Sequence, residues 1–457
     1  MLFSSIEFLY YFLPIVIIGY FFLPKVLRNG WLLAVSLVFY AWGEPKLIRV
    51  MLASIVLNWA WGIGIGRAKT RGWKRFFLVL SCLTCLGLLG WFKYADFAVE
   101  NINALLGTGI TLPKLILPIG ISFYSFQILS YTIDVYRGQA ETQYNIIDFG
   151  CYVVLFPQLI AGPIVRYVDV ERELRSRQTT MEDFRLGLRR FVFGLGKKIL
   201  IANQLGQFIE LFRASGEKSL LFYWLYALAF CLHIYFDFSG YSDMAIGLGR
   251  IFGFRFPENF DYPFISRSIQ EFWRRWHMTL GGWFRDYLYI PLGGSRVGRV
   301  KWLRNVLFVW LFTGLWHGAA WNFVLWGLMF AALLLVEKWI PAIAKMPAFL
   351  CHGYVLLAVG ISFVLFNAAS LQQAAQDIGG MFGAGGVPLV NAQTLYYLRS
   401  YAMVLLLGIA GAMPWLKKWA LRFDGTWIEP VAVAALLVLC TASLVDGSFN
   451  PFLYFRF

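Results

Sequence analysis

Long apolar stretches separated by short polar segments run through the whole sequence. Each is close to the roughly 20 residues that an α-helix needs to cross a bilayer. The pattern predicts an all-α, multi-pass membrane protein with about 11 or 12 transmembrane helices, organised as a single domain over residues 1–457. Examples of these stretches are Phe8–Leu23, Leu47–Ile65, Phe76–Phe92, Leu220–Phe238, Tyr354–Ala369 and Val431–Val445.

One apolar stretch, Ile147–Pro163, differs from a simple crossing. It lies between Arg137 and the basic segment Arg166–Arg190, and it contains Pro157 and Gly162. Irregular backbone at membrane depth is tolerated only where protein or water satisfies its freed polar groups. We therefore expect a re-entrant or broken segment here.

The distribution of basic residues predicts the orientation of the chain. Residues 67–75 are rich in Lys and Arg, whereas Tyr94–Pro113 carries Asp96 and Glu100 but no basic residue. Cytoplasmic loops are enriched in Lys and Arg, so the first segment is expected inside and the second outside. Alternation along the chain then places the N-terminus and the C-terminal tail, residues 447–457, on the outer side.

Composition supports a membrane protein over a nucleic-acid-binding one. The chain is 59% hydrophobic and 14% charged, with a mean hydropathy of +0.64, so lipid is the expected solvent. A net charge of +15 would suggest nucleic acid in a soluble protein, but here the basic residues gather in short loops. The first apolar stretch lacks a basic n-region and a cleavage site, so we expect it to be retained.

Common catalytic and metal-binding motifs are missing from the sequence. It has no G-x-S-x-G, Walker A or H-E-x-x-H motif in a suitable context, and its His and Cys residues lack metal-ligand spacing. These observations argue against a hydrolase, an ATPase or a metalloenzyme, and we expect no bound metal. Cys82 and Cys85 could form a redox pair, but their Leu-rich surroundings favour packing.

His317 is a candidate catalytic base. It lies about thirteen residues beyond Arg304, which corresponds to roughly 20 Å along a helix and so to the outer half of the membrane. Gly314 and Gly318 flank it and would let a substrate or another backbone approach closely. A neutral imidazole there could accept a hydroxyl proton; the alternative is a histidine that packs between helices.

His277 lies among cations and aromatic residues that are expected near the inner interface. Arg274, Arg275 and Arg285 could hold a phosphate-bearing donor. The alternative is an interfacial aromatic belt with snorkelling arginines. Earlier in the chain, Asp237 and Asp243 lie at the inner end of an apolar stretch. They could orient loops or a histidine, but a structural role is favoured.

Several motifs together resemble the membrane-bound O-acyltransferase family, in particular its bacterial alginate O-acetylation branch. The resemblance extends from Met1 to about Gly327, and it implies a bundle with broken segments around a central tunnel and a catalytic core over about residues 114–330. The motifs are Trp316-His317-Gly318, Glu271-Phe-Trp-Arg-Arg-Trp-His277, Tyr235-Phe-Asp-Phe-Ser-Gly-Tyr-Ser-Asp243, Leu117-Pro-Ile-Gly-Ile-Ser-Phe123 and Ile160-Ala-Gly-Pro163.

The resemblance implies a membrane O-acyltransferase that O-acetylates an extracytoplasmic polysaccharide such as alginate or peptidoglycan. His317 and His277 would be catalytic, and Trp276, Trp316 and Asn322 would join the three arginines in binding substrate. Acetyl-CoA would be the donor substrate, with no bound cofactor. The chain would lie in the bacterial inner or plasma membrane, surrounded by lipid, beside an extracytoplasmic SGNH or esterase-like acetyltransferase.

The C-terminal segment Phe452–Phe457 is similar to an F-x-Y-x-x-F motif of such acylation systems, in which the tyrosine is proposed to carry the acyl group. Here that residue is Tyr454. A phenol with a pKa near 10 is a poor nucleophile at neutral pH, but a nearby imidazole could activate it. The alternative is an amphipathic terminus whose aromatic residues lie in the outer interface.

Three other functions remain open from the sequence. The chain could transfer D-alanine or another acyl group to a teichoic-acid-like polymer. It could move a glycan precursor as a transporter or flippase without chemistry, although no repeat symmetry is evident. It could also be a scaffold that contacts partners through Leu371–Leu398.

Overall fold

The apolar stretches of the sequence form helices. The computed structural model describes residues 1–113, 115–447 and 449, and these residues contain helices, turns and irregular segments but no strand. The described chain divides into two compact units, Met1–Phe191 with Ser242–Glu258, and Val192–Tyr241 with Asn259–Phe457. The predicted all-α fold is confirmed, whereas the single-domain organisation and the core boundaries stay predictions.

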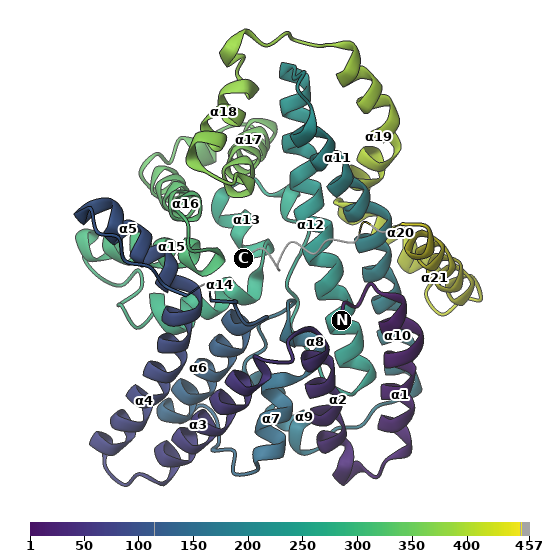
Figure 1. Ribbon diagram of the computed structural model, residues 1–457. Coiled ribbons are helices and arrows are strands. Elements are labelled where there is room, and N and C mark those ends of the chain that lie inside the picture. The colour runs from purple at the N-terminus through teal and green to yellow at the C-terminus, as the bar shows by residue number, and fades with distance from the viewer. Residues whose placement is uncertain (114, 448, 450–457) are drawn as a thin grey trace. The chain divides into compact units, whose positions relative to one another are not determined.

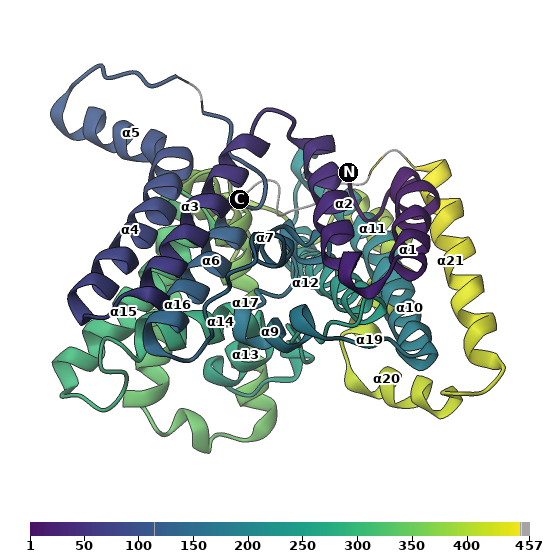
Figure 2. The same cartoon turned by 90° about the horizontal axis from the view of Figure 1, so that it is seen from below.

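The first unit contains the N-terminal helices. Within it, α3, α4 and α6 lie side by side (Figure 1), and α7 packs against α2 (Figure 2). The helices are α1 (Leu13–Phe22), α2 (Arg28–Gly43), α3 (Ile48–Arg67), α4 (Arg71–Leu89), α5 (Ala95–Leu106), α6 (Ile121–Arg137), α7 (Ile146–Val154), α8 (Phe156–Leu159), α9 (Tyr167–Arg175) and most of α10 (Met181–Gly196).

The second unit contains the remaining helices, and α12 continues past its boundary at Tyr241. The helices are α11 (Asn203–Ala214), α12 (Leu220–Ile251), α13 (Ile269–Arg275), α14 (Met278–Phe284), α15 (Arg299–His317), α16 (Trp321–Trp339), α17 (Ala348–Asn367), α18 (Leu371–Met381), α19 (Ala392–Gly411), α20 (Pro414–Ala420) and α21 (Ile428–Asp446). Short π-helices are η1 (Phe8–Phe12), η3 (Gly90–Tyr94), η4 (Lys197–Ala202) and η6 (Arg285–Tyr289). Short 3₁₀ helices are η2 (Lys25–Leu27), η5 (Pro263–Ile265), η7 (Ile343–Lys345), η8 (Ala384–Gly386) and η9 (Leu421–Phe423).

Seven helical segments of the described chain are long and apolar enough to cross a membrane, which agrees with the predicted multi-pass membrane protein. Each of the six apolar stretches used as examples above overlaps a helix. The number of crossings and the side of each loop stay predictions. The seven segments are Ile48–Arg67, Arg71–Leu106, Leu220–Ile251, Trp321–Trp339, Ala348–Asn367, Ala392–Gly411 and Ile428–Asp446.

The predicted break within Ile147–Pro163 is present. Helix α7 ends at Val154, Leu155 leaves the helical conformation with φ −51° and ψ 111°, and α8 begins at Phe156. Pro157 occupies an early position of α8, where its missing N–H costs no helical hydrogen bond. The free backbone N–H of Phe156 donates to the Ser36 hydroxyl at 3.0 Å, so the break is satisfied within the protein.

The two carboxylates of the Tyr235–Asp243 motif have structural partners. In the second unit, Asp237 is buried in α12 and lies 2.5 Å from the Lys198 ammonium group, which is also buried. In the first unit, Asp243 accepts a hydrogen bond from Arg190 at 2.9 Å. Because a buried charge is costly unless it is paired, these ion pairs explain how α12 can remain helical through polar positions. The structural role expected for both residues agrees with this geometry.

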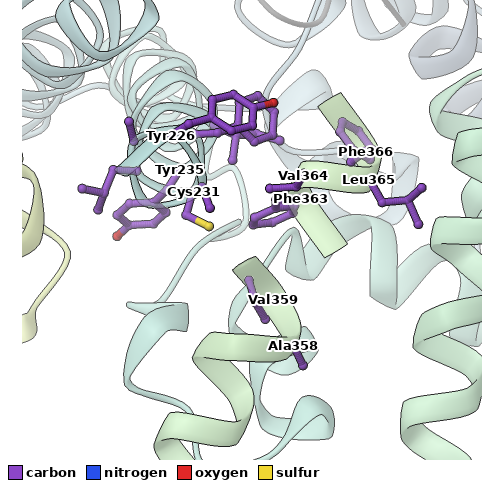
Figure 3. Close-up of a cluster of buried hydrophobic side chains, with 14 of the residues drawn as sticks. Tyr226, Cys231, Tyr235, Ala358, Val359, Phe363, Val364, Leu365 and Phe366 are labelled. Atoms are coloured by element: carbon purple, nitrogen blue, oxygen red, sulfur yellow. The ribbon is translucent and has the colours of Figure 1, made fainter. Parts of the chain in front are cut away.

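An aromatic core surrounds α12 and α17 in the second unit. Figure 3 shows Tyr226 and Tyr235 of α12 together with Phe363 and Phe366 of α17 in one cluster of buried side chains. Trp276, Phe323 and Trp326 belong to the same cluster. Trp326 and Phe366, whose rings contact His317, therefore belong to this core.

Candidate active site

His277 lies at a strained point of the backbone. Helix α13 ends at Arg275, Trp276 is extended, and His277 adopts the left-handed conformation with φ 43° and ψ 52° before α14 begins. A non-glycine residue rarely adopts a positive φ, and such residues gather at functional sites. Tyr262 is the other non-glycine residue with a positive φ among those the structure describes.

Hydrogen bonding assigns the tautomer of His277. Its Nδ1 lies 3.1 Å from Asn259 Oδ1, and the backbone N–H of Thr279 donates to the same atom at 3.3 Å. Since a backbone N–H can only donate, the amide oxygen faces this turn and His277 Nδ1 must carry the proton. The other ring nitrogen, Nε2, therefore has its lone pair available and has no hydrogen-bond partner among the described residues.

The His277 ring is suited to remain neutral. His277 is 1% exposed, and it lies outside the seven candidate membrane spans. Burial lowers the pKa of His277 well below its usual value, and the neighbouring His317 lowers it further. A neutral imidazole with a free Nε2 can accept a proton or a hydrogen bond at neutral pH.

His317 is the last residue of α15. Its ring centre lies 6.5 Å from that of His277. The rings of Trp326 and Phe366 lie nearly perpendicular to the His317 ring, at centroid distances of 5.0 and 5.3 Å. His317 is 5% exposed. Trp316 lies beside both histidines, at 5.0 Å from His317 and 5.8 Å from His277.

Glycines bring α15 close to α16 and so place His317. A Cβ atom on Gly314 would lie 2.3 Å from the backbone oxygen of Phe323, and one on Gly327 would lie 2.2 Å from that of Trp310. Both contacts are shorter than any real Cβ atom tolerates, so only glycine allows this approach. The expected close approach of another backbone at Gly314 is therefore present.

Asn322 joins the start of α16 to the end of α17. Its side-chain amide donates to the backbone oxygens of Phe366 at 3.3 Å and Ala368 at 3.0 Å. The amide hydrogens thus bond to the end of α17, the segment from which the Phe366 ring contacts His317. A direct contact between Asn322 and substrate stays a prediction.

The three predicted donor-binding arginines differ in their surroundings. Arg275 pairs with Glu271 at 3.0 Å and with Asp261 at 2.9 Å, and Arg285 pairs with Asp286 at 2.7 Å. Arg274 is exposed, and the part of the chain that the structure describes offers it no ion pair. Arg274 is accordingly the arginine whose charge is most available, although none of the three is shown to bind substrate.

The remaining predicted site residues are Trp276, which is 3% exposed and stacks on Phe272, and Tyr454, which lies outside the described residues. The acyl-carrier role of Tyr454 therefore stays a prediction. Among the residues described, no group of three His, Cys, Asp or Glu side chains is placed to hold a metal ion.

The sequence reasoning missed Asn259 and the aromatic rings around the histidines. Asn259 is 18 positions before His277, and its amide oxygen is a partner that only the folded turn reveals. Phe238 of α12 contacts the His277 ring edge-on at 4.6 Å. A useful signal for Asn259 was its place at the start of the long polar stretch that contains His277.

The arrangement can support proton transfer during attack on an acyl group. Two imidazoles lie near one another among aromatic rings, with their ring centres 6.5 Å apart. An imidazole can remove the proton of an attacking hydroxyl and return it to the leaving group. Exclusion of water by the surrounding rings would limit hydrolysis of an activated acyl group.

Comparisons with known proteins agree with this chemistry. The model of the membrane-bound O-acyltransferase family matches residues 71–372, which include both histidines. The chain is 38% identical to the probable alginate O-acetylase AlgI of Pseudomonas putida, over 100% of both chains. It is 32% identical to the peptidoglycan O-acetyltransferase of Helicobacter pylori, over 100% of this chain and 98% of that one.

A more distant similarity covers about half of the chain. The teichoic acid D-alanyltransferase of Bacillus subtilis is 29% identical over 54% of this chain and 67% of its own length. The family match covers about two thirds of the 457 residues, and the first two relatives match along the entire chain. The protein therefore belongs to the membrane-bound O-acyltransferase family and is a multi-pass membrane O-acyltransferase.

Proposed function

We propose that this enzyme takes acetyl groups from acetyl-CoA on the cytoplasmic side and supplies them for O-acetylation of an extracytoplasmic polysaccharide, such as alginate or peptidoglycan. The observation that carries the proposal is the buried pair His277 and His317, with ring centres 6.5 Å apart. It is supported by full-length similarity to proteins named as a probable alginate O-acetylase and a peptidoglycan O-acetyltransferase.

In the proposed reaction, His317 is the general base. Its imidazole removes the proton of an acceptor hydroxyl while the hydroxyl oxygen attacks the thioester carbonyl of acetyl-CoA. The new ester C–O bond forms, the C–S bond breaks, and the proton passes from the imidazolium to the leaving CoA sulfur. His277 contacts the donor side through its free Nε2, and Arg274 attracts the phosphates of CoA.

The acceptor hydroxyl in our proposal is the phenol of Tyr454, which then passes the acetyl group to a partner outside the membrane. The partner is an SGNH or esterase-like acetyltransferase with its own catalytic serine, and the protein lies in the bacterial inner or plasma membrane. This direction of transfer is supported by the distribution of charge, from which we predict residues 67–75 inside and the tail outside.

The test uses the full chain in proteoliposomes with radiolabelled acetyl-CoA supplied on one side. We expect thioester cleavage when the donor faces the side of residues 67–75, and label on a C-terminal peptide of the wild type but not of Tyr454→Phe. Cleavage without labelled Tyr454 would retain the enzyme and reject the carrier. Intact acetyl-CoA together with movement of a glycan precursor across the bilayer would favour a transporter instead.

D-Alanyl transfer is the second candidate, because the chain shares 29% identity with a teichoic acid D-alanyltransferase over 54% of its length. It predicts that a D-alanyl thioester on a carrier protein is consumed faster than acetyl-CoA. Supplying both donors in the same proteoliposomes separates the two reactions. Preference for the alanyl donor would overturn the proposed acetyl specificity but not the enzyme class.

A further inference from the structure

A buried asparagine clamps the turn that carries His277. Asn259 is 0% exposed, and its amide oxygen receives hydrogen bonds from the Thr279 hydroxyl at 2.8 Å, the Thr279 N–H at 3.3 Å and His277 Nδ1 at 3.1 Å. One acceptor atom thus gathers three donors from positions 277–279. This concentration of donors leaves the imidazole no freedom to present the other tautomer.

The backbone around Asn259 reinforces the clamp. The Asn259 carbonyl accepts the N–H of Met278 at 3.0 Å, and the N–H of Asp261 donates to the carbonyl of Arg275 at 2.9 Å. These two bonds pair an extended segment with the residues on either side of His277. They help to hold His277 at φ 43°, a conformation that a non-glycine residue adopts only when its surroundings enforce it.

We infer that Asn259 is a positioning residue for acyl transfer, which holds His277 in the Nδ1–H tautomer and aims its Nε2 lone pair at the reacting group. The inference rests on the proposed function, because it requires that His277 act in the reaction. The sequence motifs assign no role to Asn259. Its effect passes through the imidazole, and it is not itself a group that touches substrate.

The surroundings of His277 make the pH profile a specific readout. The rings in contact with it are those of Phe238, Phe260, Trp316 and His317. His317 is the one titratable group among these ring contacts. A charge introduced at position 259 therefore acts on the protonation of His277 more directly than on that of His317.

Asn259→Asp and Asn259→Ala separate positioning from simple packing. The carboxylate of Asn259→Asp still accepts the three hydrogen bonds but favours a protonated imidazole, which must lose its proton to act. For Asn259→Asp we expect the acidic limb of the pH profile of kcat/KM to shift to higher pH by about one unit or more. Activity should be largely restored at pH 8. Asn259→Ala should lower kcat at least about tenfold while KM for acetyl-CoA changes less than about threefold.

Thr279→Val is the matched control, because it removes a hydrogen bond to the same oxygen and leaves the one from His277. We expect activity within about threefold of wild type and an unchanged pH profile. Activity as low as that of Asn259→Ala, or an unshifted profile in Asn259→Asp, would reduce Asn259 to a structural clamp. If His277→Ala remains active, the proposed role of His277 fails instead. Melting curves of each variant show whether it is folded. If Asn259→Ala does not fold, the pH profile of Asn259→Asp decides the question.

Discussion

Two neighbouring arginines in α13 carry the same charge in different surroundings. Arg275 is tied to Glu271 and Asp261, whereas Arg274 is exposed and has no ion pair among the described residues. An ion-paired guanidinium is less available to an anionic ligand because its hydrogen-bond donors are already used. The proposed contact with the CoA phosphates therefore belongs to Arg274.

Substitution of these arginines by glutamine tests the assignment. Arg274→Gln should raise KM for acetyl-CoA about fivefold, equivalent to roughly 1 kcal/mol, with kcat nearly unchanged. Arg275→Gln should instead lower the melting temperature and affect KM less. Steady-state kinetics and thermal melts of the two purified variants give the comparison, and equal KM values for Arg274→Gln and wild type would contradict it.

At the residue scale, the sequence located the two histidines but not what holds them. His317 and His277 are two of only four histidines, and polar residues in an apolar chain stand out because burial makes them costly. Asn259 escaped prediction because its function depends on an amide oxygen that meets His277 only after the turn forms. The residues next to Asn259 in the sequence do not indicate such a contact.

The α15–α16 pair depends on two glycines that no alanine can replace without movement. Gly314→Ala would place a methyl group 2.3 Å from the Phe323 backbone oxygen, so the helix that ends at His317 must shift. We expect a stability loss of about 1–3 kcal/mol and at least a tenfold loss of acyl transfer.

Gly353→Ala in α17 is the control for this change. A Cβ atom on Gly353 would meet nothing within 4 Å, and alanine favours a helix over glycine by up to about 1 kcal/mol. The control should therefore melt at or above the wild-type temperature and keep its activity. Full activity in Gly314→Ala would show that the close packing of α15 on α16 does not position His317.

The Asp183 carboxylate, near the start of α10, is expected to make the stability of the fold depend on pH in acid. Asp183 accepts hydrogen bonds from Thr180 at 2.9 Å and from Arg255 at 2.7 Å. Burial raises the pKa of its carboxyl, but these hydrogen bonds outweigh burial and lower the pKa to about 2. The carboxylate thus stabilises the fold fully above its unfolded pKa of about 3.9, and this contribution is lost as pH falls towards about 2.

Asp183→Asn removes that dependence. We expect a loss of about 1 kcal/mol at pH 7, kept small because Arg255 is largely exposed and solvent screens its charge. Between pH 4 and about 2 the wild type should lose stability more steeply than the variant. Parallel melting-temperature profiles of the two proteins would contradict the account of this carboxylate.

At the element scale, prediction succeeded where the cause is local. The break near Pro157 was predictable because proline has no backbone N–H to continue the hydrogen-bond pattern of a preceding helix. The continuation of α12 to Ile251 was not, since Asp237 is tolerated through a buried ion pair with Lys198, 39 positions earlier. The segment after Tyr94, predicted as an outer loop, also contains α5, and an amphipathic helix of this kind is weakly marked in sequence.

At the scale of the whole molecule, membership of the family establishes that the reaction is acyl transfer. The acyl donor, the acceptor and the direction of transfer across the membrane are proposed. The site lies within the second compact unit, where α13, α14 and α15 bring His277 and His317 together. The orientation in the membrane is a prediction that rests on charge alone. Donor identity and the route of the acetyl group are consequently the claims that experiment must decide.

The most direct test is single-turnover cleavage of acetyl-CoA by the purified full chain in nanodiscs. Wild type should release CoA, and His317→Ala should do so about 10² to 10⁴ times more slowly. His352→Ala is the control, because His352 contacts the Ser266 carbonyl at 3.2 Å and belongs to no proposed step. Equal rates in His317→Ala and wild type, with both proteins folded by thermal melting, would contradict a reaction based on His317.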